Sequence, residues 1–120
     1  MKLKPEVKDE GVSREIWYAL GVAAALMAKI DKALVVTSLT DGTHNPGSLH
    51  PKGLAVDIRV KGLTDEQAKT FVADLNRILD CSGFDVVFEG GVGATPATTG
   101  AHAHIEFDPK KGESFFVRGV

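Results

Sequence analysis

The 120-residue chain contains a single cysteine, Cys81, and this scarcity excludes two kinds of site. No internal disulfide can form, and a zinc site built from several thiolates is impossible. Because Cys81 falls at the end of an expected helix, we interpret it as a structural thiol rather than a nucleophile. Any metal site in this chain must therefore use histidine and carboxylate ligands.

Long hydrophobic runs and concentrations of one charge are missing too. The most apolar stretch, residues 19–30, is shorter than the ~18 residues that a membrane span needs, and it fits a buried helix. The basic start of the chain is not followed by an apolar segment, so we expect no secretory signal. A net charge of −2 with both signs interspersed gives no basic surface for nucleic acid and no polybasic membrane anchor. We therefore expect neither a nucleic-acid nor a membrane partner.

The length suits one domain with one core. We expect residues 1–11 to form an extended or poorly ordered lead-in and residues 12–120 to form a single domain. Apolar residues recur three and four positions apart after Ser13, which predicts a helix with Ser13 as its N-cap. Thr64 and Gln67 form a capping-box pattern that opens a second amphipathic helix.

Short β-branched or alternating segments predict the strands. They are residues 33–38, 54–60, 84–89 and 102–107, with 114–118 as a candidate for a last edge strand. Residues 39–52 should form a long irregular loop, because Asp, Gly, Thr, Asn and Pro follow one another closely there. These elements predict an α+β fold in which two helices pack on one face of a small, mostly antiparallel sheet.

The histidines are grouped around two of these strands. His44 and His50 lie in or beside the loop that precedes Asp57. His102 and His104 are two positions apart on one strand, so their side chains point to the same face. Asp57 also lies on the polar face of its strand, because its neighbours Val56 and Ile58 are apolar.

Two imidazoles and one carboxylate suit Zn²⁺ and leave a fourth position for water, as in catalytic zinc sites. Such an ion lowers the pKa of its water to ~7 and polarises a carbonyl, which peptide hydrolysis requires. A histidine pair on a strand is, taken alone, more often a surface feature than a metal site.

Residues 41–58, DGTHNPGSLHPKGLAVDI, resemble the SxHxxGxAxD signature of the D-alanyl-D-alanine carboxypeptidase and endolysin families. They are still more similar to the amino-terminal signalling domain of hedgehog proteins. His102-Ala103-His104 resembles the HxH strand of the same superfamily, which includes lysostaphin-type enzymes. The resemblance implies one zinc ion held by His50, Asp57 and His104. It also implies a hedgehog/DD-peptidase-like fold and hydrolysis of an amide bond in peptidoglycan stem peptides.

The general base stays open. In many carboxypeptidase relatives an acidic residue lies three positions before the last zinc histidine, where this chain has Ala101. Glu89 is one candidate, with residues 90–101 as an inserted loop or lid, although it could equally end an edge strand in solvent. His102 is the other candidate, as base or as a group that stabilises the oxyanion. Glu106 lies one step along the strand from the last histidine, roughly 7 Å away, which suits a supporting or solvent role.

Substrate binding has three candidates: His44, Ser48 and Arg59. His44 matches a histidine near the metal in the hedgehog pattern and either contacts substrate or caps its loop. Ser48 either bonds the loop or orients a ligand. Arg59 points to the ligand side of its strand and is placed to receive a substrate carboxylate. The usual upstream arginine of the carboxypeptidases is absent, since residues 38–41 are SLTD, so endopeptidase cleavage stays open.

The sequence supports three functional hypotheses. The first is a monomeric zinc peptidase of bacterial cell-wall peptides, made in the cytoplasm and acting at the wall. Short members of these families commonly come from bacteriophages, which is in keeping with the missing signal peptide. The second is a zinc-binding module that has lost catalysis, which the absence of an acid at position 101 favours. The third is a plain α+β domain with incidental histidines.

Overall fold

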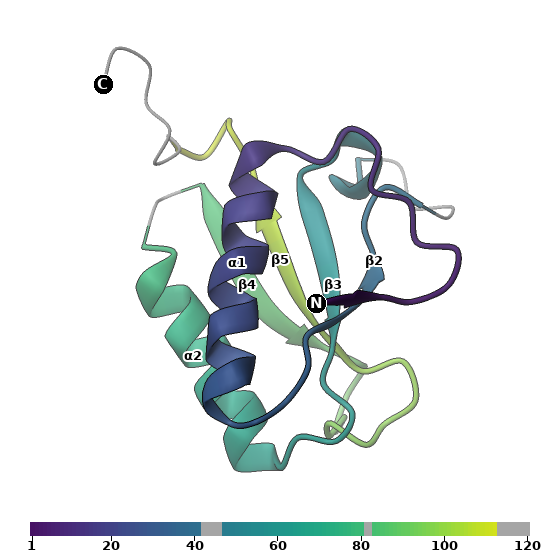
Figure 1. Ribbon diagram of the computed structural model, residues 1–120. Helices are drawn as coiled ribbons and strands as arrows, with labels where there is room; N and C mark the ends of the chain where they lie inside the picture. Colours follow the sequence, from purple (N-terminus) through teal and green to yellow (C-terminus); the bar gives the residue numbers. More distant parts are fainter. Residues whose placement is uncertain (42–46, 81–82, 113–120) are drawn as a thin grey trace.

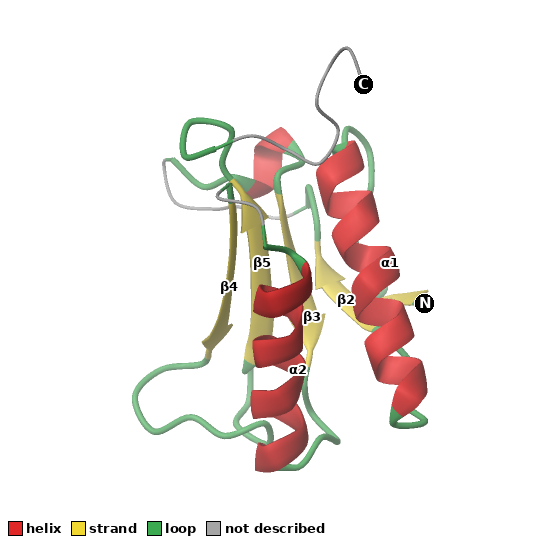
Figure 2. Ribbon diagram, turned by 90° about the vertical axis from the view of Figure 1, so that its left-hand side faces the viewer, coloured by secondary structure: helices red, strands yellow, loops and turns green. Residues whose placement is uncertain are grey.

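The computed structural model describes residues 1–41, 47–80 and 83–112, and it confirms the α+β architecture (Figure 1). Helices α1 (Arg14–Lys29) and α2 (Asp65–Ile78) lie on the same face of a five-stranded sheet (Figure 2). The strands are β1 (Lys2–Leu3), β2 (Val35–Ser38), β3 (Ala55–Arg59), β4 (Phe84–Glu89) and β5 (His102–Phe107), in the order β1-β2-β3-β5-β4. Only β1 and β2 pair in parallel; the other pairs are antiparallel.

Both helices begin at the caps that the sequence predicts. The hydroxyl of Ser13 accepts a hydrogen bond from the backbone N–H of Ile16. Thr64 and Gln67 exchange two hydrogen bonds between side chain and backbone, which completes a capping box. These local bonds satisfy N–H groups that a helix start otherwise leaves without partners, so they fix where each helix starts.

The core lies between the helices and the sheet. Alternate residues of the central strands point toward it and are almost fully buried: Val56 and Ile58 on β3, and Ala103, Ile105 and Phe107 on β5. The helices contribute Ile16, Leu20, Met27, Phe71 and Leu75. Since neighbouring residues of a strand face opposite ways, the polar residues between them must lie on the face without helices.

The N-terminal segment runs along the domain instead of away from it. Its β1 strand pairs with β2, and further on the carbonyl of Lys8 accepts hydrogen bonds from the N–H and hydroxyl of Thr40. Gly11 then packs so closely on Gly53 that a Cβ at Gly53 would overlap the Gly11 carbonyl. Residues 1–11 thus brace the loop that leads to the candidate site, which the expectation of a simple lead-in did not include.

Some sequence predictions lie outside the described residues. These are His44, the Cys81 thiol and the candidate strand at 114–118. Within the ranges that the structure does describe, no helix is long and apolar enough to cross a bilayer.

Candidate metal centre

The candidate site lies on the face of the sheet opposite the helices, where β3, β5 and β4 are neighbours. Backbone pairing places Asp57 opposite His104, and it places Arg59 opposite His102. On the other side of β5, His102 is paired with Glu89. Side chains on residues paired in this way have Cβ atoms only ~4.5–5.5 Å apart. The fold therefore brings together groups from three separate segments of the chain.

Asp57 is at the centre of the cluster. Its Oδ1 atom is 2.7 Å from Nδ1 of His104, and its Oδ2 atom is 3.4 Å from Nε2 of His50. The rings of His50 and His104 have their centroids 5.3 Å apart. Both histidines that the sequence predicts as metal ligands therefore contact the third predicted ligand, Asp57.

Glu89 and His102 border the same cluster. The Oε1 atom of Glu89 is 2.9 Å from Nε2 of His102 and 3.7 Å from Nδ1 of His104. Asp57, Glu89, His102 and His104 each offer a ligand atom, and these atoms all lie within 4.8 Å of one another. This cluster could bind a metal ion. Glu89 ends an edge strand and its side chain is 49% exposed, and it also contacts the cluster through His102.

Each central histidine has an outer partner that orients its ring. Nδ1–H of His50 donates to the carbonyl of Leu39 at 2.8 Å, which directs Nε2 toward Asp57. Nε2–H of His104 donates to Glu106 at 2.9 Å, which directs Nδ1 toward Asp57. Metal-binding histidines almost always use their second nitrogen in this way. The arrangement leaves one nitrogen of each ring aimed at the place where an ion would lie.

The loop that holds His50 is itself tied down. The N–H groups of Leu39 and Lys8 both donate to Oδ1 of Asp41, at 2.8 and 3.2 Å. The hydroxyl of Ser48 accepts from the backbone N–H of His50 at 3.2 Å, so Ser48 supports the turn. Sequence reasoning missed the Leu39 contact, because a backbone carbonyl carries no residue-type signal.

The charges in the cluster stabilise one another. For Asp57, burial alone would raise the pKa, but hydrogen bonds from His104 and His50 outweigh it and hold the pKa well below its usual range. The hydrogen bond to Asp57 raises the pKa of His104 to about 9 against the effect of burial, and Glu106 contributes to the rise. Burial would lower the pKa of His50, yet the bond to Asp57 raises it overall. In the metal-free protein His104 is therefore a cation between two carboxylates at neutral pH.

We expect binding of a metal ion, with zinc as the probe, to release a proton from His104. With a pKa of about 9 the ring is protonated at pH 7, and its Nδ1 must lose a proton before it can ligate a metal. Zinc affinity should therefore rise with pH until about pH 9. Calorimetry at pH 7 in two buffers with different ionisation enthalpies measures the released proton. An affinity independent of pH would contradict this assignment.

The same pKa shifts predict how the stability of the metal-free protein depends on pH. A raised histidine pKa stabilises the fold fully below the unfolded value of ~6.5, and this stabilisation is lost as the pH rises through about 9. The lowered pKa of Asp57 acts in the opposite sense, since its contribution is lost as the pH falls below ~4. Both contributions are present in full between about pH 4 and pH 6.5. Chemical denaturation of the chelated protein should therefore give the largest free energy of unfolding in that range.

Glu106 is expected to strengthen metal binding through His104. Replacing Glu106 with glutamine keeps a hydrogen-bond acceptor and removes the charge, so affinity for a metal ion, probed with zinc, should fall about 10-fold, with a larger loss for alanine. A competition titration against a chromogenic chelator measures the change. The control is Asp85→Asn, because Asp85 is an exposed carboxylate paired with Glu106 on the same face. An equal loss in the control would assign the effect to general electrostatics.

The loop between β4 and β5 is not a lid over the histidines along its whole length. Its residues 94–96 line a cavity of about 490 Å³ with Ala68 and Val72 of α2 and with Phe88. That cavity is on the helix-covered side of the sheet. The end of the loop does reach the site, where the carbonyl of Gly100 accepts a hydrogen bond from Nδ1 of His102 at 2.8 Å.

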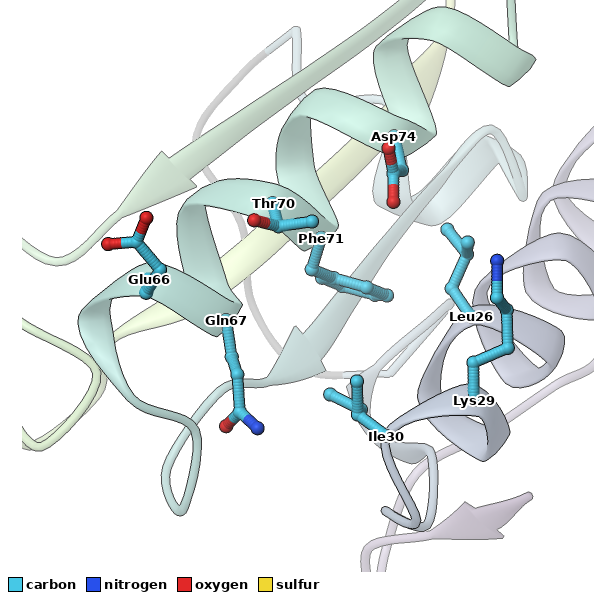
Figure 3. Close-up of a pocket in the computed structure, with 8 residues that line it drawn as sticks. All are labelled: Leu26, Lys29, Ile30, Glu66, Gln67, Thr70, Phe71 and Asp74. Atoms are coloured by element: carbon cyan, nitrogen blue, oxygen red, sulfur yellow. The ribbon is translucent and has the colours of Figure 1, made fainter.

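A further cavity of about 360 Å³ is lined by residues of both helices (Figure 3). Phe71 forms part of its wall, and Leu26 and Lys29 of α1 face it. It contains none of the clustered histidines, and it lies on the helical side of the molecule, away from the metal cluster. Neither cavity therefore belongs to the candidate site.

Arg59, the remaining predicted substrate contact, is exposed and lies on the same face as Asp57.

Comparisons with protein-family models, with curated proteins and with solved structures find no match for this chain. The chemistry of the site must therefore be argued from the residues that form it.

Proposed function

We propose that the protein is a zinc-dependent peptidase that hydrolyses an amide bond in peptidoglycan stem peptides. The observation that carries the proposal is the position of Asp57 between oriented nitrogens of His50 and His104, with Glu89 at the edge of the same cluster. The resemblance of residues 41–58 and 102–104 to cell-wall peptidases supports the choice of substrate.

The donor set fits zinc better than a harder cation. Imidazole nitrogens suit zinc, whereas calcium and magnesium prefer sites made of oxygen. Two ligand sets overlap at Asp57 and His104, and they differ in whether His50 or the Glu89–His102 pair completes the site. We assign His50 as the third ligand because it is buried and its other nitrogen is fixed by a backbone carbonyl. Zinc bound there would polarise a peptide carbonyl and lower the pKa of a water molecule to ~7.

Glu89 and His102 are then available for proton transfer. Nδ1–H of His102 donates to Gly100, and Nε2 is 2.9 Å from the carboxylate of Glu89. The two side chains are therefore within hydrogen-bond distance and hold each other in place. The Glu89 side chain is 49% exposed, so substrate and water can reach it. We assign Glu89 as the base that takes a proton from water and returns it to the leaving amine, with His102 holding it in place.

One feature favours a second candidate function, a zinc-binding module without catalysis. Position 101, where many carboxypeptidase relatives have an acid, is a buried alanine in this chain. In that case the cluster would bind zinc for structure or recognition, and Glu89 would have no catalytic role.

Zinc content measured together with turbidity loss of purified peptidoglycan tests both candidates. One equivalent of zinc with lysis that a chelator abolishes supports the peptidase. Zinc without lysis across several wall types would favour the inactive module. A protein that takes up no zinc after dialysis against the ion would overturn both.

A further inference from the structure

We infer that Arg59 binds the free terminal carboxylate of the peptide substrate, so that the enzyme removes a C-terminal residue instead of cutting within a chain. This inference rests on the proposed peptidase function and decides between two modes of cleavage that the sequence leaves open. It is carried by the position of Arg59 on the sheet, by the charges around it and by the absence of an ion-pair partner for it among the described residues.

Arg59 lies next to the residues assigned to proton transfer. It is paired with His102 across β3 and β5, and His102 is paired with Glu89 across β5 and β4. Ile58, which precedes it, is fully buried on the helical side, so Arg59 shares the open face with Asp57. Arg59, His102 and Glu89 therefore form one row across the sheet, beside the predicted metal ligands.

This row is where the leaving group must lie. The base returns its proton to the amine that departs, so the departing residue has to contact Glu89. When that residue is the last of its peptide, its carboxylate is separated from its amine by a single carbon. A group on the same row can therefore bind the carboxylate while Glu89 protonates the amine.

The charges on this face favour Arg59 for that role. The side chains that point out from β3, β5 and β4 are those of Ala55, Asp57, Arg59, His102, His104, Glu106, Asp85, Val87 and Glu89. Arg59 alone among them carries a permanent positive charge, and the acidic ones would repel a substrate carboxylate. An anionic terminus is thus accommodated at the Arg59 end of the face, where a guanidinium can bind it with two parallel hydrogen bonds.

Arg59 is also available. Across the described parts of the chain it takes part in no ion pair, whereas Arg77 pairs with Asp74 at 3.4 Å. Glu89, the acid of its own row, is hydrogen-bonded to His102 instead. Arg59 and Glu89 are separated by two strand-to-strand steps, because β5 lies between β3 and β4. At ~4.8 Å per step their backbones are ~10 Å apart, a gap that their two long side chains can share with one substrate residue. A substrate that continued beyond this point would place a neutral amide beside the guanidinium.

The test compares N-acetyl-D-alanyl-D-alanine with its C-terminal amide. Wild-type protein loaded with zinc should cleave the acid with a kcat/KM at least about 10-fold above that of the amide. Arg59→Ala should lower kcat/KM for the acid about 10- to 100-fold, as expected when a charge-assisted hydrogen bond is lost. It should leave the amide nearly unchanged, and Arg59→Lys should retain part of the preference. The matched control is Lys61→Ala, which removes an exposed cation just beyond β3.

Calorimetric binding of both probes to Glu89→Gln protein, with and without Arg59→Ala, separates this inference from the proposed function. One outcome is that the protein binds the acid more tightly than the amide, that this preference depends on Arg59, and that the wild type hydrolyses neither probe. This outcome would support the carboxylate site and refute the peptidase. Equal binding and cleavage of acid and amide would overturn the inference and leave an endopeptidase. The inference would also be overturned if Arg59→Ala lowered the affinity for both probes equally, or for neither.

Discussion

For the proposed zinc peptidase, we expect Asp57→Asn to abolish stoichiometric zinc binding and to reduce hydrolysis of cell-wall peptides to background. Asp57 contacts both His50 and His104, so its charge holds the two imidazoles around one point. The affinity loss should exceed the ~10- to 100-fold typical of changes to outer partners, because a direct ligand is removed. Zinc per protein after dialysis, together with peptidoglycan turbidity, measures both effects.

The matched control is Asp85→Asn, the same chemical change at an exposed position of the same sheet face. It should retain zinc and activity. Circular dichroism of both variants establishes that each is folded. If Asp57→Asn still bound one equivalent of zinc, the ligands would have to be sought among Glu89, His102 and His104.

Glu89→Gln should lower turnover by about 10²- to 10⁴-fold while one zinc ion stays bound. Glutamine has nearly the same shape as glutamate but cannot accept a proton from water. The change should appear in kcat rather than in zinc content, which mass spectrometry under native conditions reports directly. The control is Glu66→Gln on α2, which changes an exposed acid on the helical side.

Two other results would each reassign Glu89. Loss of zinc together with activity would make Glu89 a ligand, in line with its place among the clustered donor atoms. Full activity would move the role of base to His102, and His102→Asn would then be the next variant to measure.

Alternation along residues 54–60 and 102–107 was enough to predict which face carries the polar groups. The reason is that strand side chains alternate strictly, so the pattern fixes the face without any knowledge of the partner strand. Helix starts at Ser13 and Thr64 were predictable for a similar reason, since caps depend on residues within one turn. What alternation does not reveal is which strands pair and in what register. The meeting of Glu89 with His102 depends on that register, which is set by the whole core.

Glu106 shows where spacing along a strand misleads. Its backbone is one step of ~7 Å from that of His104, which suggested a supporting or a solvent role. The side chain reaches back, and its carboxylate is 2.9 Å from the ring, so the supporting role applies. The bracing by residues 1–11 was hidden for another reason. A parallel pairing of only two residues in β1 leaves no periodic signal in a segment of mixed charge.

The position of β4 has a consequence for how the proposed peptidase would lose activity during storage. In the described part of the sheet β4 is an edge strand, whereas β3 and β5 each have a neighbour on both sides. Edge segments open at lower free energy than central ones, so mild heating should detach Glu89 while Asp57 and His104 stay together. Hydrolytic activity would then be lost before the bound ion dissociates. A stored sample could retain one zinc ion per protein molecule and have little hydrolytic activity, so its metal content would overstate the active fraction.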